Sequence, residues 1–200
     1  QEVVVENQQL QAENILNQYE VLKNQLNPHM LFNSLNTLRS LVREDQDKAQ
    51  EYIQELSRVL RYTLQGNDSK SVTLRDEMEF VSAYIFLLKM RFEDNLSFDI
   101  RIDKQYDDHR LPPMAVQMLI ENAVKHNEIS DRRPLSIRVY TEGEELVVTN
   151  PVQPKLTATA GTGVGLANLA KRYHLLYKCE IQITENKYFT VRIPLIPNAL

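Results

Sequence analysis

The sequence predicts an α+β protein, with an N-terminal antiparallel helical hairpin followed by a C-terminal α/β sandwich. Up to about residue 91, apolar residues recur at steps of three and four, the period of an amphipathic helix. From about residue 96, apolar and polar residues alternate instead, as in half-buried strands, with helical stretches between the alternating segments. We therefore expect paired helices over residues 1–70, a connecting helix over 71–95 and the sandwich over 96–200.

Composition narrows the class of protein. The chain has 200 residues, 42% hydrophobic and 25% charged, with a formal net charge of −4. It has no run of lysines or arginines, so we expect no nucleic-acid partner. No apolar run reaches the roughly 18 residues that a membrane-spanning helix needs. The chain starts without methionine inside an apparent coiled coil, which suggests a piece of a longer protein.

A single cysteine excludes an internal disulfide. Cys179 stands among Tyr177, Ile181 and Ile183, a setting that favours a buried, unreactive thiol over a reactive one. A reducing compartment fits this cysteine usage.

The first helix carries the heptad pattern of a coiled-coil seam, which implies a partner helix. Its seam positions are Val5, Gln8, Ala12, Ile15, Tyr19, Leu22 and Leu26, and the stripe resumes as Leu31, Leu35, Leu38 and Val42. Because the step from Leu26 to Leu31 is five residues, the seam rotates there, and Pro28 favours a kink that absorbs the rotation.

His29 lies at this rotation. Relative to Leu31 it is two residues back, about 160° around a helix, which leaves its ring on a flank of the seam. The kink and the register break favour an exposed, functional imidazole. A core histidine satisfied by a neighbouring group is the alternative that the residues leave open.

Two further helices are predicted. The first runs from Asp47 to Leu64, and it exposes with its antiparallel neighbour more apolar surface than the pair can cover, so we expect a homodimer with a four-helix bundle. The second runs from about Leu74 to Arg91 and connects to the sandwich. Thr73 and Asp76 resemble a capping box at its start, and the acids Asp76, Glu77 and Glu79 lie where its helix dipole favours them.

The second half alternates over residues 97–103, 135–150 and 179–195, which we interpret as one strand and two hairpins. The hairpins are predicted to turn at Glu142-Gly143 and at Glu185-Asn186. Helices are expected over Pro112–Asn127, with Pro112 and Pro113 in the first turn, and over Gly165–Tyr177. These elements predict a largely antiparallel sheet with helices on one face.

Two motifs in this half carry chemistry. "GTGVGLAN" places Gly161, Gly163 and Gly165 at the start of a helix, where main-chain amides favour phosphate, but a plain flexible loop explains the glycines as well. "ENAVKHN" places Asn122, Lys125 and His126 on one helix face. An amide oxygen can ligate Mg²⁺ and an ammonium can meet phosphate, whereas a solvated polar face is the alternative.

Together these residues resemble a known family. "QLNPHMLFNSLNTL", "LPPMAVQMLIENAVKHN" and "GTGVGLANLAKRYHLLY" look like the phosphoacceptor box, the N box and the glycine-rich box of LytS-type sensor histidine kinases. "VTLRDEMEFVSAYIFLLKMRFED" also resembles the family's connector, and the likeness runs from about Tyr19 onward. The resemblance implies a dimerising helical hairpin followed by an ATP-binding domain of the Bergerat type, as in gyrase.

The resemblance also implies an activity and its residues. His29 would accept a phosphoryl group from ATP and pass it to an aspartate of a response regulator receiver domain. Apart from the resemblance, Asn33 lies one turn after His29, where it could orient the ring or its attacking lone pair. Asn122 would hold Mg²⁺, and Lys125 and His126 would contact phosphates. The remaining nucleotide-binding residues implied are Asn150, Gly161, Thr162, Gly163, Gly165 and Leu166. The chain would be a cytoplasmic domain of a bacterial sensor anchored upstream in the plasma membrane.

The sequence departs from the family pattern at several positions. Asn150-Pro151 replaces the usual aspartate and glycine, but an asparagine oxygen still accepts a hydrogen bond from the adenine amino group. Met118 stands where gyrase-like ATPases have their water-activating glutamate, which disfavours hydrolysis. Asn127 and Met30 replace a common glycine and a common phenylalanine. An ATPase of the same fold and a catalytically silent dimeric scaffold are the alternative functions.

Overall fold

A computed structural model of the chain describes residues 9–11, 28–65, 70–157 and 163–198. The chain divides into two compact units, Gln1–Gln65 and Gly66–Leu200, which we describe separately. Most of the predicted seam upstream of Pro28, the kink at Pro28 and the side chain of His29 lie outside the described residues. No described helix is both long and apolar enough to cross a membrane.

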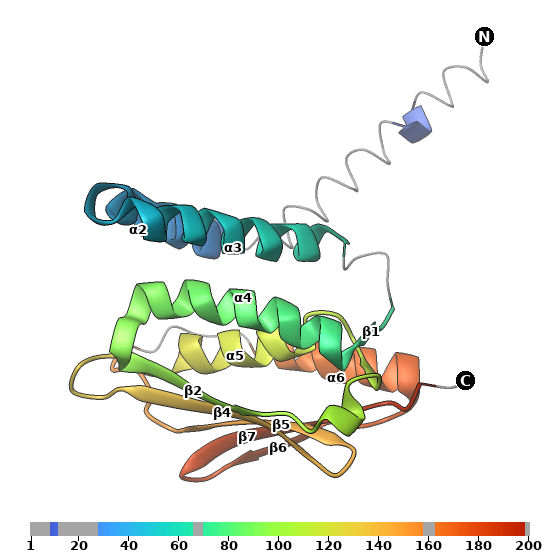
Figure 1. Cartoon of the computed structure of the whole chain (residues 1–200). Helices are drawn as coiled ribbons and strands as arrows, with labels where there is room; N and C mark the ends of the chain where they lie inside the picture. The colour runs from blue at the N-terminus through green and yellow to red at the C-terminus, as the bar shows by residue number, and fades with distance from the viewer. Residues whose placement is uncertain (1–8, 12–27, 66–69, 158–162, 199–200) are drawn as a thin grey trace. The chain divides into compact units, whose positions relative to one another are not determined.

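The first unit is a helical hairpin. Helix α2 (Pro28–Glu44) packs against α3 (Gln46–Gln65), whose bounds agree with the predicted helix within one residue at each end (Figure 1). Asp45 joins the two helices, because its carboxylate accepts the Lys48 main-chain N–H at 3.2 Å and its carbonyl accepts that of Ala49 at 3.0 Å. The tight turn therefore makes consecutive helices antiparallel neighbours.

The second unit is a sheet covered by helices on one face (Figure 1). Its sheet has five strands in the order β2-β4-β5-β7-β6. The strands are β2 (Leu96–Arg101), β4 (Leu135–Glu142), β5 (Glu145–Pro151), β6 (Gln182–Glu185) and β7 (Tyr188–Pro194). The helices are α4 (Leu74–Phe92), α5 (Ala115–His126) and α6 (Val164–Tyr177), and β1 (Val72–Thr73) pairs with β3 (Arg110–Leu111). The predicted α+β sandwich is thus confirmed.

The sheet is antiparallel except for one pair. Strands β2 and β4 are parallel, whereas the other three pairs of this sheet are antiparallel. Helix α5 lies between β2 and β4 in the chain, and a crossover of this kind returns the chain in the same direction. The parallel pair was not anticipated, because strand alternation reports which face is buried and not the direction of a neighbour.

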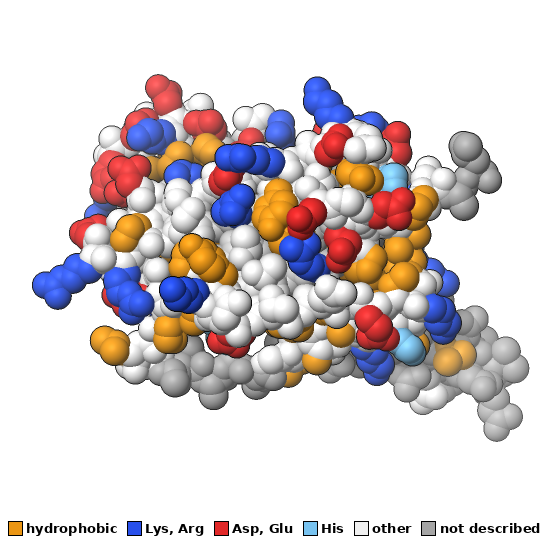
Figure 2. All heavy atoms as spheres, turned by 90° about the horizontal axis from the view of Figure 1, so that it is seen from below, with side chains coloured by type: hydrophobic (Ala, Val, Ile, Leu, Met, Phe, Trp, Pro, Cys, Tyr) orange, Lys and Arg blue, Asp and Glu red, His pale blue; other side chains and the backbone are white. Residues whose placement is uncertain are grey.

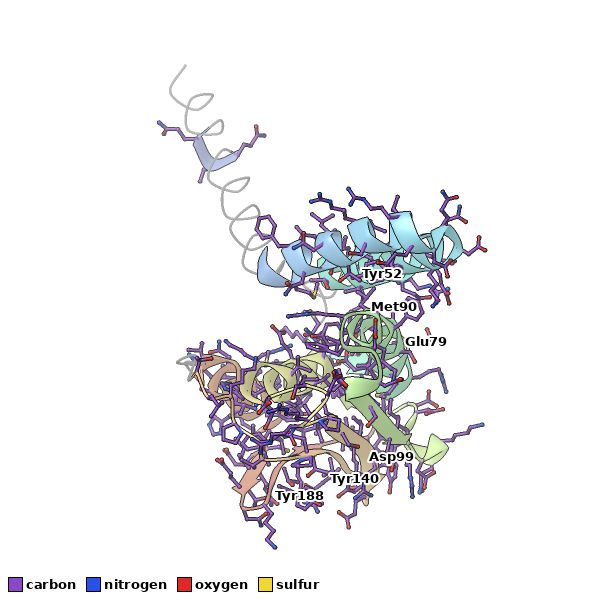
Figure 3. All side chains as sticks on the ribbon, turned by 90° about the vertical axis from the view of Figure 1, so that its left-hand side faces the viewer. Tyr52, Glu79, Met90, Asp99, Tyr140 and Tyr188 are labelled. Atoms are coloured by element: carbon purple, nitrogen blue, oxygen red, sulfur yellow. The ribbon has the colours of Figure 1, made fainter. Side chains whose placement is uncertain are left out.

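The two faces of the sheet differ in polarity. On the helix-covered face, the buried side chains of Ile137, Val139, Leu146, Val148 and Ile193 form the core. On the other face, acidic and basic side chains are interspersed with apolar ones (Figure 2). Asp99, Tyr140 and Tyr188 mark this open face along successive parts of the sheet (Figure 3). The apolar core therefore lies between the sheet and the helices that cover it.

Two local expectations need correction. Pro112 and Pro113 precede α5, which begins at Ala115, and do not form its first turn, because Met114 adopts a left-handed conformation at φ 64° between them and the helix. Cys179 is only half-buried, since it precedes the exposed edge strand β6, and its thiol donates to the Tyr177 carbonyl at 3.3 Å. Helix α4, the expected connecting helix, packs against α5 and β2.

Candidate nucleotide site

Helix α5 carries three side chains of the candidate site. It packs against α4, α6 and strand β5, with Val116, Ile120 and Ala123 buried. Asn122, Lys125 and His126 are related by three and four residues, so they share one face of the helix. Asn122 and His126 are half-buried and Lys125 is exposed. The helix therefore presents an amide, an ammonium and an imidazole at the edge of the core.

Asn122 has the chemistry of a magnesium ligand. Within the part of the chain that the structure describes, its side-chain amide has no hydrogen-bond partner. The described residues also contain no group of three or more His, Cys, Asp or Glu side chains that would hold a metal by themselves. Mg²⁺ in nucleotide sites commonly takes one or two protein oxygens and completes its shell with phosphates and water. A single amide oxygen fits that mode of binding.

The surroundings of His126 favour the neutral form of its imidazole. Partial burial lowers the pKa of its imidazole, and the charges of Lys125 and Lys155 lower that pKa further. The pKa of Lys155 is itself lowered by burial and by the charge of Arg91. Among the described residues, neither Lys125 nor Lys155 pairs with an acid. This end of α5 therefore offers positive potential to an anionic ligand.

Asn150 lies on strand β5 and is 2% exposed. It shares the helix-covered face with Val148, and its side-chain Nδ2 donates to the Pro151 carbonyl at 2.8 Å. No donor from the described residues reaches its Oδ1. A nearly buried amide oxygen without a donor has the chemistry to accept a hydrogen bond from a ligand.

Asn127 and Gln153 join the end of α5 to the segment after β5. Asn127 Nδ2 donates to the Ala123 carbonyl at 2.8 Å, and its Oδ1 accepts the Gln153 main-chain N–H at 2.9 Å. The Gln153 amide donates to the carbonyls of Glu128 at 2.7 Å and Arg133 at 3.0 Å. Asn127 has φ −114°, so the backbone at this position does not require glycine. Through these hydrogen bonds, Asn127 and Gln153 hold the chain near the end of α5. Lys155 follows Gln153 by two residues and is therefore held near α5 as well.

The glycine motif precedes α6. Gly163 adopts a left-handed conformation at φ 57°, which glycine tolerates, and is the N-cap residue of the helix. A Cβ on Gly165 would lie 3.8 Å from the Met118 sulfur, so α5 and α6 approach closely at this point. Leu166 is half-buried, while Gly161 and Thr162 lie outside the described residues. An apolar thioether, and no carboxylate, therefore faces the start of α6 from position 118.

The phosphoacceptor segment lies in the other unit. His29 lies in the first turn of α2, and its side chain is outside the part of the chain that the structure describes. Asn33 is half-buried, and its carbonyl accepts the Thr37 hydroxyl at 2.9 Å. The structure therefore leaves the predicted roles of both residues as predictions.

Sequence reasoning missed Gln153 and Lys155. Gln153 follows Asn150 by three residues in the stretch between β5 and the glycine motif, and no periodic pattern marks it as buried. The isolated bridge between Asn127 and Pro154 brings this stretch to α5. Only the polar composition of this stretch gave a signal, and it pointed to solvent.

Comparison with known proteins identifies relatives over most of the chain. Residues 17–96 match the family model described as histidine kinase. The sensor protein LytS of Streptococcus agalactiae is 34% identical over 176 residues, which cover 79% of this chain and 30% of that protein. The sensor histidine kinase BtsS of Escherichia coli is 33% identical over 186 residues, which cover 88% of this chain and 33% of that protein. The chain thus spans about a third of the length of these relatives.

Likeness to solved structures is weaker. The catalytic domain of histidine kinase ThkA matches with a TM-score of 0.42 and 18% identity, over 63% of this chain and 95% of that one. Agreement at this level supports no argument about the site. Histidine kinases as a class use ATP, and sensor kinases of two-component systems act with response regulators. On the matches to LytS, BtsS and the histidine kinase model, the chain belongs to the family of LytS-type sensor histidine kinases.

Proposed function

We propose that this chain is the kinase region of a two-component sensor and that it transfers the γ-phosphoryl group of Mg·ATP to His29. A neutral imidazole nitrogen of His29 attacks the γ-phosphorus, the bond to the β–γ bridging oxygen breaks, and its electron pair leaves with ADP. An ordinary histidine pKa of about 6.5 leaves the ring mostly neutral near pH 7. The phosphoryl group then passes to an aspartate carboxylate of a response regulator.

In this proposal the second unit binds and orients the nucleotide. Phosphoryl transfer through a loose transition state depends mainly on positioning and on neutralising charge. The Asn122 oxygen would hold Mg²⁺, which supplies charge neutralisation at the phosphates. Lys125 and the neutral His126 would contact phosphate oxygens. Gly161, Thr162, Gly163, Gly165 and Leu166 would line the nucleotide at the start of α6.

The observation that carries the proposal is the state of Asn150. Its Oδ1 is nearly buried on the helix-covered face and receives no donor from the described residues. Leaving a buried acceptor unpaired costs about 1–3 kcal/mol, so this arrangement is understandable if a ligand supplies the donor. The exocyclic amino group of adenine is such a donor, which supports adenine recognition by Asn150.

Met118 argues against hydrolysis as the main activity. Its sulfur lies close to Gly165 at the start of α6, where a water-activating carboxylate would be needed. A thioether is at best a weak acceptor and cannot take a proton from water. We therefore propose transfer to histidine and not steady release of phosphate.

We further propose that the hairpin forms a homodimer. Large apolar side chains remain exposed on α2 and α3, with exposed fractions of 68% for Phe32, 50% for Leu35, 53% for Val42 and 46% for Ile53. Apolar surface of this kind on paired helices favours association into a four-helix bundle. By analogy with its relatives, the full-length protein would be a membrane-anchored bacterial sensor with this region in the cytoplasm.

Radiolabelling tests the proposed reaction. The chain is incubated with Mg·ATP labelled at the γ-phosphate, and the protein-bound label is measured before and after acid treatment. We expect acid-labile label on the wild-type chain and none on His29→Gln. The matched control is His109→Gln, which changes a histidine outside the proposed site and should retain label. Clean ATP binding without any label would contradict the proposal, and label persisting in His29→Gln would contradict the assignment of His29.

A further inference from the structure

One buried carboxylate has no role in the nucleotide site described above. Glu77 lies in the first turn of α4 and is 0% exposed. Its Oε2 accepts the Met114 main-chain N–H at 3.0 Å, and its Oε1 accepts that of Val116 at 3.2 Å. The position of Glu77 suggested a stabilising charge for its own helix. The structure shows that it caps a different helix, α5.

Helix α5 lacks a cap of its own. Its N-cap residue is Met114, a left-handed residue whose side chain makes no capping hydrogen bond. The first N–H groups of a helix have no acceptor within the helix, and an anion is favourable at that positive end. Glu77 supplies both the acceptors and the charge from α4. The start of α5 therefore depends on a side chain 37 residues earlier in the chain.

A cation from α6 reaches the segment just before α5. Arg172 of α6 donates its Nη2–H to the Pro113 carbonyl at 3.1 Å and is half-buried. Burial lowers the pKa of its guanidinium, and the charge of Glu77 opposes that effect. The turn that leads into α5 is thus held by a carboxylate from α4 and a guanidinium from α6.

The segment that leads into α4, just before Glu77, is also held by hydrogen bonds. Strand β1 pairs with β3, and the Leu74 N–H donates to the His109 carbonyl at 2.8 Å. Arg110 donates to the hydroxyl and the carbonyl of Ser71, at 2.7 Å and 2.9 Å. The first turn of α4 therefore has little freedom relative to the segment that precedes α5.

We propose that Glu77 and Arg172 are positioning residues for nucleotide binding: Glu77 fixes the start of α5, and Arg172 ties the body of α6 to the segment before α5, so that Asn122 and the turn at Gly163 face one ligand. From Val116 to Asn122 is about 9 Å along a helix, so a shift at the capped end reaches Asn122 directly. This inference rests on the proposed function.

Amide hydrogen exchange without nucleotide tests the structural half. Glu77→Gln retains one acceptor oxygen but turns an NH₂ group toward the other main-chain N–H. We expect faster exchange at the first turn of α5 and in the turn of α6 around Arg172, whose side chain donates to the Pro113 carbonyl. The control is Glu79→Gln, since Glu79 is exposed on the same helix (Figure 3) and should leave exchange unchanged. Faster exchange confined to α5 would overturn the link to α6.

Binding of a fluorescent trinitrophenyl analogue of ATP with Mg²⁺ tests the functional half. We expect a higher Kd in Glu77→Gln, by up to about tenfold, because only the part of one charged hydrogen bond that is coupled to nucleotide binding appears in the Kd. Arg172→Met, a milder change at a half-buried position, should raise the Kd in the same direction, and Arg172→Lys should restore part of the affinity. Arg172→Met also decides the question if Glu77→Gln fails to fold.

A second control separates positioning from general loss of stability. Val191→Ala removes core volume on β7 and is expected to lower the melting temperature. It should leave the Kd within about twofold, because Val191 takes no part in the hydrogen bonds that link α4 and α6 to the start of α5. If Val191→Ala weakens binding as much as Glu77→Gln at equal loss of melting temperature, or if neither Glu77→Gln nor Arg172→Met changes the Kd, the inference is wrong. If the wild-type chain binds no analogue, the proposed function itself fails, and the exchange data show separately whether the helix link exists.

Discussion

Replacing Asn150 by leucine removes the proposed adenine acceptor without changing side-chain size much. The residue is 2% exposed, and its Oδ1 receives no donor from the described part of the chain. If adenine donates its amino N–H to this oxygen, Asn150→Leu leaves that N–H unpaired in a dry site. Such a loss costs about 1–3 kcal/mol, or roughly 5- to 150-fold in Kd.

The choice of nucleotide isolates this hydrogen bond. Inosine triphosphate carries a carbonyl in place of the adenine amino group, so it offers an acceptor where Asn150 Oδ1 needs a donor. Wild type should therefore prefer ATP to ITP by roughly tenfold or more, and Asn150→Leu should bring the ratio of the two Kd values close to one. Competition against a fluorescent analogue measures both constants in one series.

Thr149 provides the matched control for Asn150. It is also buried on β5 but lies on the opposite face, where its hydroxyl is 2.7 Å from the Thr190 hydroxyl. Thr149→Val should cost stability but keep the preference for ATP. The reasoning is refuted if Asn150→Leu retains the wild-type preference, or if Thr149→Val loses it.

Three further predictions concern charge, capping and assembly. Lys155→Gln should raise the pKa of His126, measured by NMR titration. Because folding lowers this pKa, the free energy of unfolding falls as pH drops from about 6.5 through the pKa of the folded state. The variant should narrow the pH range over which that stability is lost. An unchanged pKa would place Lys155 away from His126. Thr73→Ala, which loses the hydroxyl that accepts the Asp76 N–H at 3.2 Å, should lower the free energy of unfolding by about 1 kcal/mol in urea titrations, and a loss near zero would contradict the cap. Val42→Glu should shift the chain toward monomer in sedimentation, and an unaltered dimer would exclude this face of α2.

Elements with a local cause could be predicted from the sequence. The period of the apolar residues predicted α3, whose bounds were right within one residue at each end. Thr73 predicted the start of α4, and Gly143, at φ 59°, predicted the turn between β4 and β5. Each of these depends on residues within a few positions of one another, so a linear sequence contains what is needed.

Features that depend on partners distant in sequence could not be predicted in this way. Glu77 read as a favourable charge in the first turn of its own helix, which is a correct local statement that misses its acceptor role for Met114 and Val116. Gln153 read as a polar residue of a solvated loop, yet it is buried because carbonyls from residues 128–134 surround its amide. A polar side chain looks the same in sequence whether water or a distant carbonyl satisfies it.

The same reasoning explains why the site divides as it does between predicted and unpredicted residues. Residues proposed to touch the nucleotide stand in short motifs, because a helix face or a helix start gathers them locally, as with Asn122, Lys125 and His126. Residues that hold those motifs in relation to one another come from other helices and loops, since two helices can be fixed only by something that contacts both. Glu77 and Arg172 both contact the segment at the start of α5, so substitutions there, far from the proposed nucleotide contacts, should alter nucleotide binding.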